Sequence, residues 1–77
     1  MNKTYILTGS KELLQEMKDE LLQNGYVLGT VNPEWDKVAV YINSKCIDLY
    51  ACYAIGKKIT LTPSNYDEVK QKILNDE

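Results

Sequence analysis

The chain has 77 residues, of which 44% are hydrophobic and 26% charged, and its formal net charge is -2. A chain of this length buries only about 60% of the surface that its unfolded form exposes, so we expect one small core and a single domain over residues 1–77. The mild negative charge and the lack of arginine and histidine argue against nucleic-acid binding, histidine-dependent catalysis and the usual zinc ligands.

The two cysteines, Cys46 and Cys52, are too few to cross-link a secreted scaffold, and their spacing matches no zinc or redox pair. No apolar run approaches the roughly 20 residues of a membrane span, and the first residues lack a signal-peptide apolar region. We therefore expect a cytoplasmic protein with no cofactor, no metal and no membrane contact. The abundance of Lys, Asn, Ile and Tyr is typical of AT-rich coding sequences and favours a phage or low-GC bacterial origin.

The first elements predicted along the chain are a strand, a helix and a second strand. Residues 5–8 form a short apolar strand, and Ser10 is a natural N-cap for the helix that follows. Apolar residues then recur at helical spacing up to Asn24-Gly25, where glycine ends the helix. Residues 26–30 form the second strand. Such a crossover unit predicts that the two strands are parallel.

The second half of the chain reads as three strands and a helix. "VNPEWD" is a turn, because Pro33 cannot donate a hydrogen bond, and residues 37–42 form a strand that Asn43-Ser44 connects to the next. Residues 46–55 are predicted as a strand, and a short helix there is less favoured by the Tyr and Ile content. A last strand over residues 59–62 leads into a helix capped by Ser64.

The resulting order, βαββββα, predicts an α+β fold with a single mixed sheet of four or five strands and two helices on one face. Apolar residues occupy both faces of some strands, so the face opposite the helices should lack cover. Monomers seldom expose an apolar patch beyond a few hundred Å2. We place Tyr41, Tyr50 and Cys52 on this uncovered face, with Trp35 at its rim.

These aromatic residues predict a protein-binding surface. Tyr and Trp supply large amphipathic contact area at low entropy cost, whereas base-stacking surfaces surround their aromatics with positive charge that this chain lacks. We therefore expect a non-catalytic protein-binding or regulatory module, not an enzyme. It would bind another protein or itself as a homodimer, as a phage or mobile-element accessory protein does.

The segment Thr8, Gly9 and Ser10 supports an alternative, a small anion or nucleotide binder. A glycine turn that leads into a helix N-terminus presents free amides to an anion. Neither the dinucleotide-binding glycine pattern nor the lysine-bearing P-loop is present, and Glu12 in the first turn would repel a phosphate. Helix capping is therefore the preferred interpretation of this segment.

Overall fold

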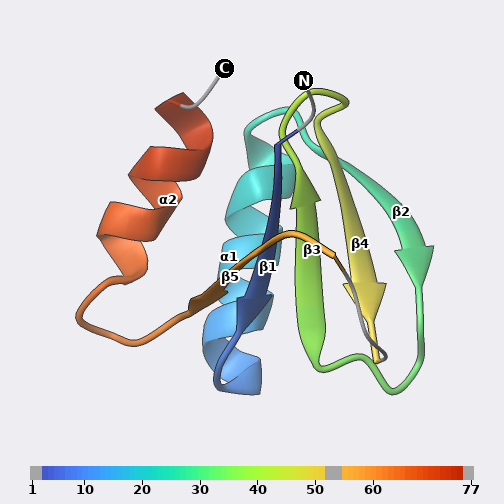
Figure 1. The fold of residues 1–77 in the computed structure, drawn as a ribbon, viewed down its shortest axis with the longest axis horizontal. Helices are drawn as coiled ribbons and strands as arrows, with labels where there is room; N and C mark the ends of the chain where they lie inside the picture. The colour runs from blue at the N-terminus through green and yellow to red at the C-terminus, as the bar shows by residue number, and fades with distance from the viewer. Residues whose placement is uncertain (1–2, 52–54, 76–77) are drawn as a thin grey trace.

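The computed structural model describes residues 3–51 and 55–75, and the predicted α+β class and element order are confirmed. The elements are the following (Figure 1): β1 (Thr4–Thr8), α1 (Lys11–Gln23), β2 (Val27–Val31), β3 (Lys37–Tyr41), β4 (Cys46–Tyr50), β5 (Lys57–Thr60) and α2 (Tyr66–Asn75). In these ranges neither helix has the length and apolar character of a membrane span.

The five strands form one sheet in the order β2-β4-β3-β1-β5. β3 is antiparallel to both β1 and β4, whereas β2 is parallel to β4 and β5 is parallel to β1. β1 and β2 therefore run in the same direction, as the crossover unit predicts. They are not neighbours, because the β3–β4 hairpin lies between them, and this leaves β2 at one edge of the sheet.

Both helices pack on the same face of the sheet. Tyr5 and Leu7 of β1 and Ile47 and Leu49 of β4 belong to one core cluster that includes the buried faces of both helices. The fully buried members include Leu7, Leu14, Met17, Leu21, Val38 and Ile47. Each such side chain stabilises the fold by about 1.5–3 kcal/mol relative to leaving it in water. Figure 1 shows α1 behind β1, with α2 beside it.

The ends of the helices follow local capping rules, with one correction. Ser10 caps α1, and its Oγ accepts a hydrogen bond from the N–H of Leu13 at 3.3 Å. The cap predicted at Ser64 is wrong, because α2 begins at Tyr66 and the carbonyl of Asn65 accepts the first helical hydrogen bond. The Asn65 side chain also accepts from the N–H of Thr62 at 2.8 Å, which holds the turn before the helix.

The predicted strand over residues 46–55 is confirmed for β4, Cys46–Tyr50, while residues 52–54 lie outside the described part of the chain. The β3–β4 hairpin is longer than the two-residue turn expected at Asn43-Ser44. It occupies residues 42–45, and Lys45 takes a positive φ of 52°. The last strand begins earlier than predicted, at Lys57, because β5 pairs with β1 from Tyr5 onward.

A polar cluster ties the two helices together at their contact. The hydroxyl of Tyr66 in α2 donates to the Glu20 carboxylate in α1, and Lys70 Nζ lies 3.1 Å from the other Glu20 oxygen. The hydrogen bond from Tyr66, followed by that from Lys70, lowers the pKa of Glu20 below its ordinary value of 4.5. Burial and the Glu20 carboxylate raise the pKa of Tyr66.

We expect the Tyr66→Phe substitution to flatten the acid dependence of stability. A carboxyl group with a lowered pKa stabilises the fold above its unfolded pKa, and this contribution is lost as the pH falls through the folded value. Without the Tyr66 hydroxyl, the pKa of Glu20 lies closer to 4.5, so less stability is lost on acidification. We expect the free energies of unfolding of wild type and variant, measured with urea, to differ more at about pH 6 than at about pH 3.

The matched control is Glu20→Gln, which keeps an acceptor for Tyr66 but has no carboxylate to titrate. In that background the Tyr66→Phe substitution should change stability equally at both pH values. An equal effect in the wild-type background would instead mean that the Tyr66 hydroxyl does not act on the Glu20 carboxylate.

Candidate functional site

The face of the sheet opposite the helices is partly covered by the chain itself. Ile6 and Ala39 on this face are 1% and 0% exposed, and Tyr41 and Tyr50 pack against them. Gly56 lies directly over Ile6, since a Cβ at Gly56 would come within 3.0 Å of Ile6 Cγ1 and 2.9 Å of the Thr4 carbonyl. The sequence had suggested that this face lacks cover, but the structure shows that its middle is covered.

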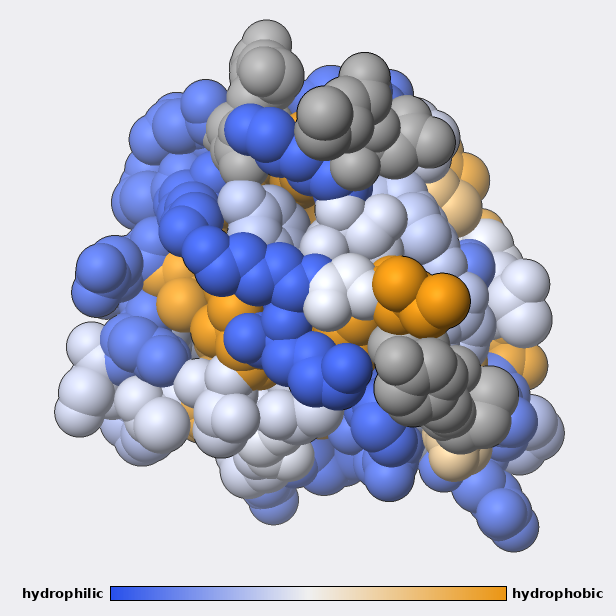
Figure 2. Space-filling view, in the orientation of Figure 1, coloured by the Kyte–Doolittle hydropathy of each residue, from blue (hydrophilic) through white to orange (hydrophobic). Residues whose placement is uncertain are grey.

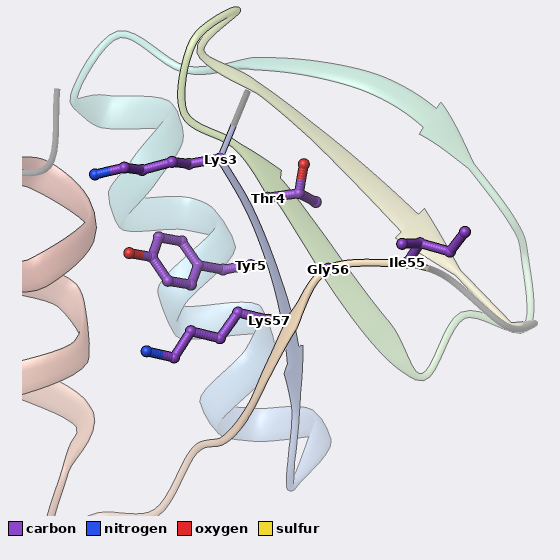
Figure 3. A pocket seen from close by; sticks show the side chains of 6 residues that line it. All are labelled: Lys3, Thr4, Tyr5, Ile55, Gly56 and Lys57. Carbon is purple, nitrogen blue, oxygen red and sulfur yellow. The ribbon is translucent and has the colours of Figure 1, made fainter. Parts of the chain in front are cut away.

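This cover follows from the strand order. β4 and β5 are separated by β3 and β1 and run in the same direction, so the chain between them has to cross the sheet. The helices occupy one face, and Gly56, in the described part of the connection, lies over the other. Figure 3 shows the chain passing from Ile55 through Gly56 to Lys57 in front of β3 and β1.

A chain of hydrogen bonds runs across the open face from β3 to β2. The hydroxyls of Tyr41 and Tyr50 lie 2.5 Å apart, and the Tyr50 hydroxyl donates to Asp48 Oδ2 at 3.4 Å. Asp48 Oδ1 accepts from the backbone N–H of Thr30 at 2.8 Å. Burial, and then the hydrogen bond with Tyr50, raises the pKa of Tyr41 well above its ordinary value of 10.0. The Tyr41 phenol therefore keeps its proton at neutral pH and serves as a structural hydrogen-bonding group.

Gly29 lets this network reach β2. A Cβ at Gly29 would overlap Asp48 Oδ1 and would lie 3.0 Å from Cys46 Sγ, so a larger residue there would displace the Asp48 carboxylate from its present position. The register between β2 and β4 shifts between Leu28 and Val31, and the Asp48 carboxylate takes up the N–H of Thr30 within this irregularity. The network therefore holds β2 in a defined, locally bulged shape.

The structure brings together two of the four residues predicted for partner binding. Tyr41 and Tyr50 lie side by side on the face opposite the helices, where the alternation of their strands places them. Cys52 lies outside the described residues. The predicted rim position of Trp35 is wrong, because its side chain is 9% exposed and belongs to the core on the helix side.

Trp35 is held there by the first turn of α1. Lys11 Nζ lies 3.8 Å from the centroid of the indole ring and donates to the Trp35 carbonyl at 2.5 Å. The Lys11 cation is attracted to the electron-rich face of the indole ring. The turn between β2 and β3 therefore contributes its aromatic residue to the core instead of to a binding surface.

The residues of the alternative anion site have local structural roles. Ser10 Oγ caps α1, and Thr8 Oγ1 lies 3.3 Å from Thr60 Oγ1 in the neighbouring strand. Gly9 has a φ of 135°, and a Cβ there would lie 2.7 Å from the carbonyl oxygen of Leu61. The glycine is thus required by the close approach of the chain that leaves β5, independently of any ligand.

Among the described residues, an exposed apolar feature that sequence reasoning missed is the edge strand β2. All five of its residues are exposed, and Val27, Leu28 and Val31 are 64%, 39% and 49% exposed. The strand carries no charge. Figure 2 shows apolar surface along the margin where Figure 1 places β2. The uncharged sequence "VLGTV" was the signal for this strand, but the strand is exposed only because it lies at the edge of the sheet.

The other edge of the sheet has the opposite character. β5 carries Lys57 and Lys58, both exposed, and charged residues on an edge strand discourage pairing with another sheet. A hollow of about 460 Å3 beside it is lined by Lys3, Thr4, Tyr5, Ile55, Gly56 and Lys57. In Figure 3 the Lys3, Tyr5 and Lys57 side chains extend toward α2, away from Ile55. Among the described residues no group of His, Cys, Asp and Glu side chains could hold a metal ion.

No family model, curated protein or solved structure matches this chain. Function is therefore inferred from the geometry of its own residues.

Proposed function

We propose that the protein is a non-catalytic binding module that associates with protein, including itself, through the β2–β4 end of its sheet. The observation that carries this proposal is the exposure of β2, an uncharged edge strand whose three large apolar side chains are 39% to 64% exposed. An exposed apolar edge of this kind is a template for pairing with another chain, and isolated proteins usually protect such edges.

The neighbouring open face supports the same proposal. Val27 is in register with Cys46, so its side chain lies on the face that carries Asp48 and Tyr50. The apolar edge thus continues into the half-buried Tyr41 and Tyr50 pair. Tyrosines next to apolar side chains combine contact area with hydrogen-bonding hydroxyls, which is the usual character of the centre of a protein interface.

The polar groups of this surface favour a role in binding over a role in catalysis. Asp48 is engaged with Tyr50 and with the Thr30 N–H, and Tyr41 is held neutral by its raised pKa. A general base needs a pKa near the working pH and a free approach to substrate. We infer a small cytoplasmic regulatory or accessory protein of phage or mobile-element type that acts by occupying its partner.

The Val27→Lys substitution tests this proposal. Val27 is 64% exposed, so lysine there should leave the fold intact while placing a charge in the apolar surface. We expect wild-type protein either to sediment above its monomer mass at micromolar concentration or to retain a protein on an affinity column, and the variant to lose that association. Circular dichroism and urea unfolding would check that the variant remains folded.

The matched control is Gln71→Lys, which adds the same charge at an exposed residue of α2, the helix that lies on the side of the molecule away from β2 (Figure 1). It should keep the association. A wild-type protein that is monomeric and retains nothing would contradict the proposed function, as would equal association by wild type and Val27→Lys.

A further inference from the structure

The exposed edge strand also indicates what the partner is. Resting on the proposed function, we propose that β2 pairs in antiparallel fashion with β2 of a second copy, across a two-fold axis between Gly29 and Thr30. The two five-stranded sheets then become one continuous sheet. The pairing places Leu28 of each copy opposite Val31 of the other.

The backbone of β2 is oriented for this pairing. The N–H of Val27 donates to the Lys45 carbonyl at 2.9 Å and that of Asn32 to the Leu49 carbonyl at 3.1 Å, so both point inward to β4. Backbone groups alternate in direction along a strand, so those of Leu28 and Val31 point outward. Two residues of antiparallel strands whose backbone N–H and C=O groups point at each other exchange two hydrogen bonds. The two-fold axis produces two such pairs.

The side chains of these two residues also match. Leu28 is in register with Ile47 and Val31 with Leu49, and both of these β4 residues are buried on the helix-facing side. Leu28 and Val31 therefore lie on the same side of the sheet, where they are 39% and 49% exposed. Directly opposed residues of antiparallel strands share a face, so the pairing brings four apolar side chains together.

The bulge in β2 is compatible with the symmetry. The extra residue lies between Leu28 and Val31, and the Asp48 carboxylate holds the N–H of Thr30 within it. A two-fold axis through this segment sets the bulge of one copy against that of the other, so the residues on either side stay in register. Because the network on the open face already holds β2 in shape, little ordering is required on association.

Charge selects a second β2 over the other strand edge of the same protein. β2 has no charged residue, whereas β5 carries Lys57 and Lys58. Pairing of β2 with β5 would bring these lysines against apolar side chains and would be a head-to-tail contact that propagates into open chains. The β2–β2 contact uses the same surface on both copies and closes at the dimer.

Charge-pair variants test both the surface and the register. In the double variants Leu28→Lys/Val31→Lys and Leu28→Glu/Val31→Glu, like charges face each other twice across the axis. Both should weaken the dimer by on the order of 100-fold or more, since like charges replace apolar contacts at symmetric positions. In the double variant Leu28→Lys/Val31→Glu, opposite charges face each other across the axis. This variant should therefore dimerise at least about tenfold more tightly than either like-charge variant. Sedimentation equilibrium measures all four proteins.

The outcomes separate this inference from the proposed function. The β2 pairing would be overturned if both like-charge variants dimerised as strongly as wild type. It would also be overturned if all three double variants had the same dimer dissociation constant. A monomeric wild type would also overturn it, while loss of a retained protein by Val27→Lys would still support binding to a different partner. Urea unfolding of each variant, diluted to the monomer, shows whether its fold is intact.

Discussion

Replacing Leu21 by alanine is expected to lower the free energy of unfolding by about 3–4 kcal/mol. Leu21 is 0% exposed and faces the core between α1 and the sheet, so its removal leaves a cavity as well as losing apolar burial. A domain of this length has a total stability of roughly 4–12 kcal/mol, so the substitution would remove a large part of it. Urea unfolding followed by circular dichroism measures the change.

The neighbouring residue Leu22 provides a matched control, since it differs from Leu21 only in position on α1. Leu22 is partly buried at the edge of the core. Its replacement by alanine removes the same atoms but leaves a site that solvent can fill, so about 1 kcal/mol or less should be lost. Equal losses at the two positions would show that α1 does not present Leu21 to the core.

Replacing Gly9 by alanine is expected to lower the free energy of unfolding by about 2–5 kcal/mol. The φ of 135° lies in a region that side-chain-bearing residues rarely adopt, and the new Cβ would lie 2.7 Å from the carbonyl oxygen of Leu61. The backbone conformation accounts for about 1–2 kcal/mol and the overpacking for about 1–3 kcal/mol. Thr8 and Leu61 are joined by a backbone hydrogen bond of 2.7 Å, which prevents the two segments from moving apart freely.

The control for this substitution is Gly25→Ala. Gly25 also has a positive φ, of 95°, but nothing lies within 4 Å of the position its Cβ would occupy. Alanine there should show only the conformational cost of about 1–2 kcal/mol. A loss at Gly9 no greater than that at Gly25 would mean that the approach of Leu61 does not determine the choice of glycine, and would reopen a ligand-related reason for it.

The helices were predictable because their signals are local. Ser10 satisfies the first amides of α1, Asn24 ends the helix, and the apolar residues between them recur with the period of an α-helix. The second helix has the same pattern in Tyr66, Val69 and Ile73, and only its cap was misplaced. Hydrogen bonds in the turn before α2 decided that start, because the Asn65 side chain bonds back to Thr62 and Thr60 while its carbonyl accepts the first helical hydrogen bond.

The faces of β4 were predictable for a similar reason. Its side chains alternate between apolar residues that face the helices, Ile47 and Leu49, and the more polar Cys46, Asp48 and Tyr50 on the other side. A strand has a period of two residues, so this assignment needs no knowledge of its neighbours. The hydrogen bond between the Tyr50 and Tyr41 hydroxyls could be assigned only from the structure.

Sequence alone thus determined the element types, the α+β class and the two-faced character of the strands, because periodicity and capping act over a few residues. Tertiary structure decided that Trp35 enters the core, that the chain near Gly56 crosses the open face and that β2 is left at the edge. These outcomes depend on contacts between residues far apart in the chain. Their energies depend on strand order, which no local pattern encodes.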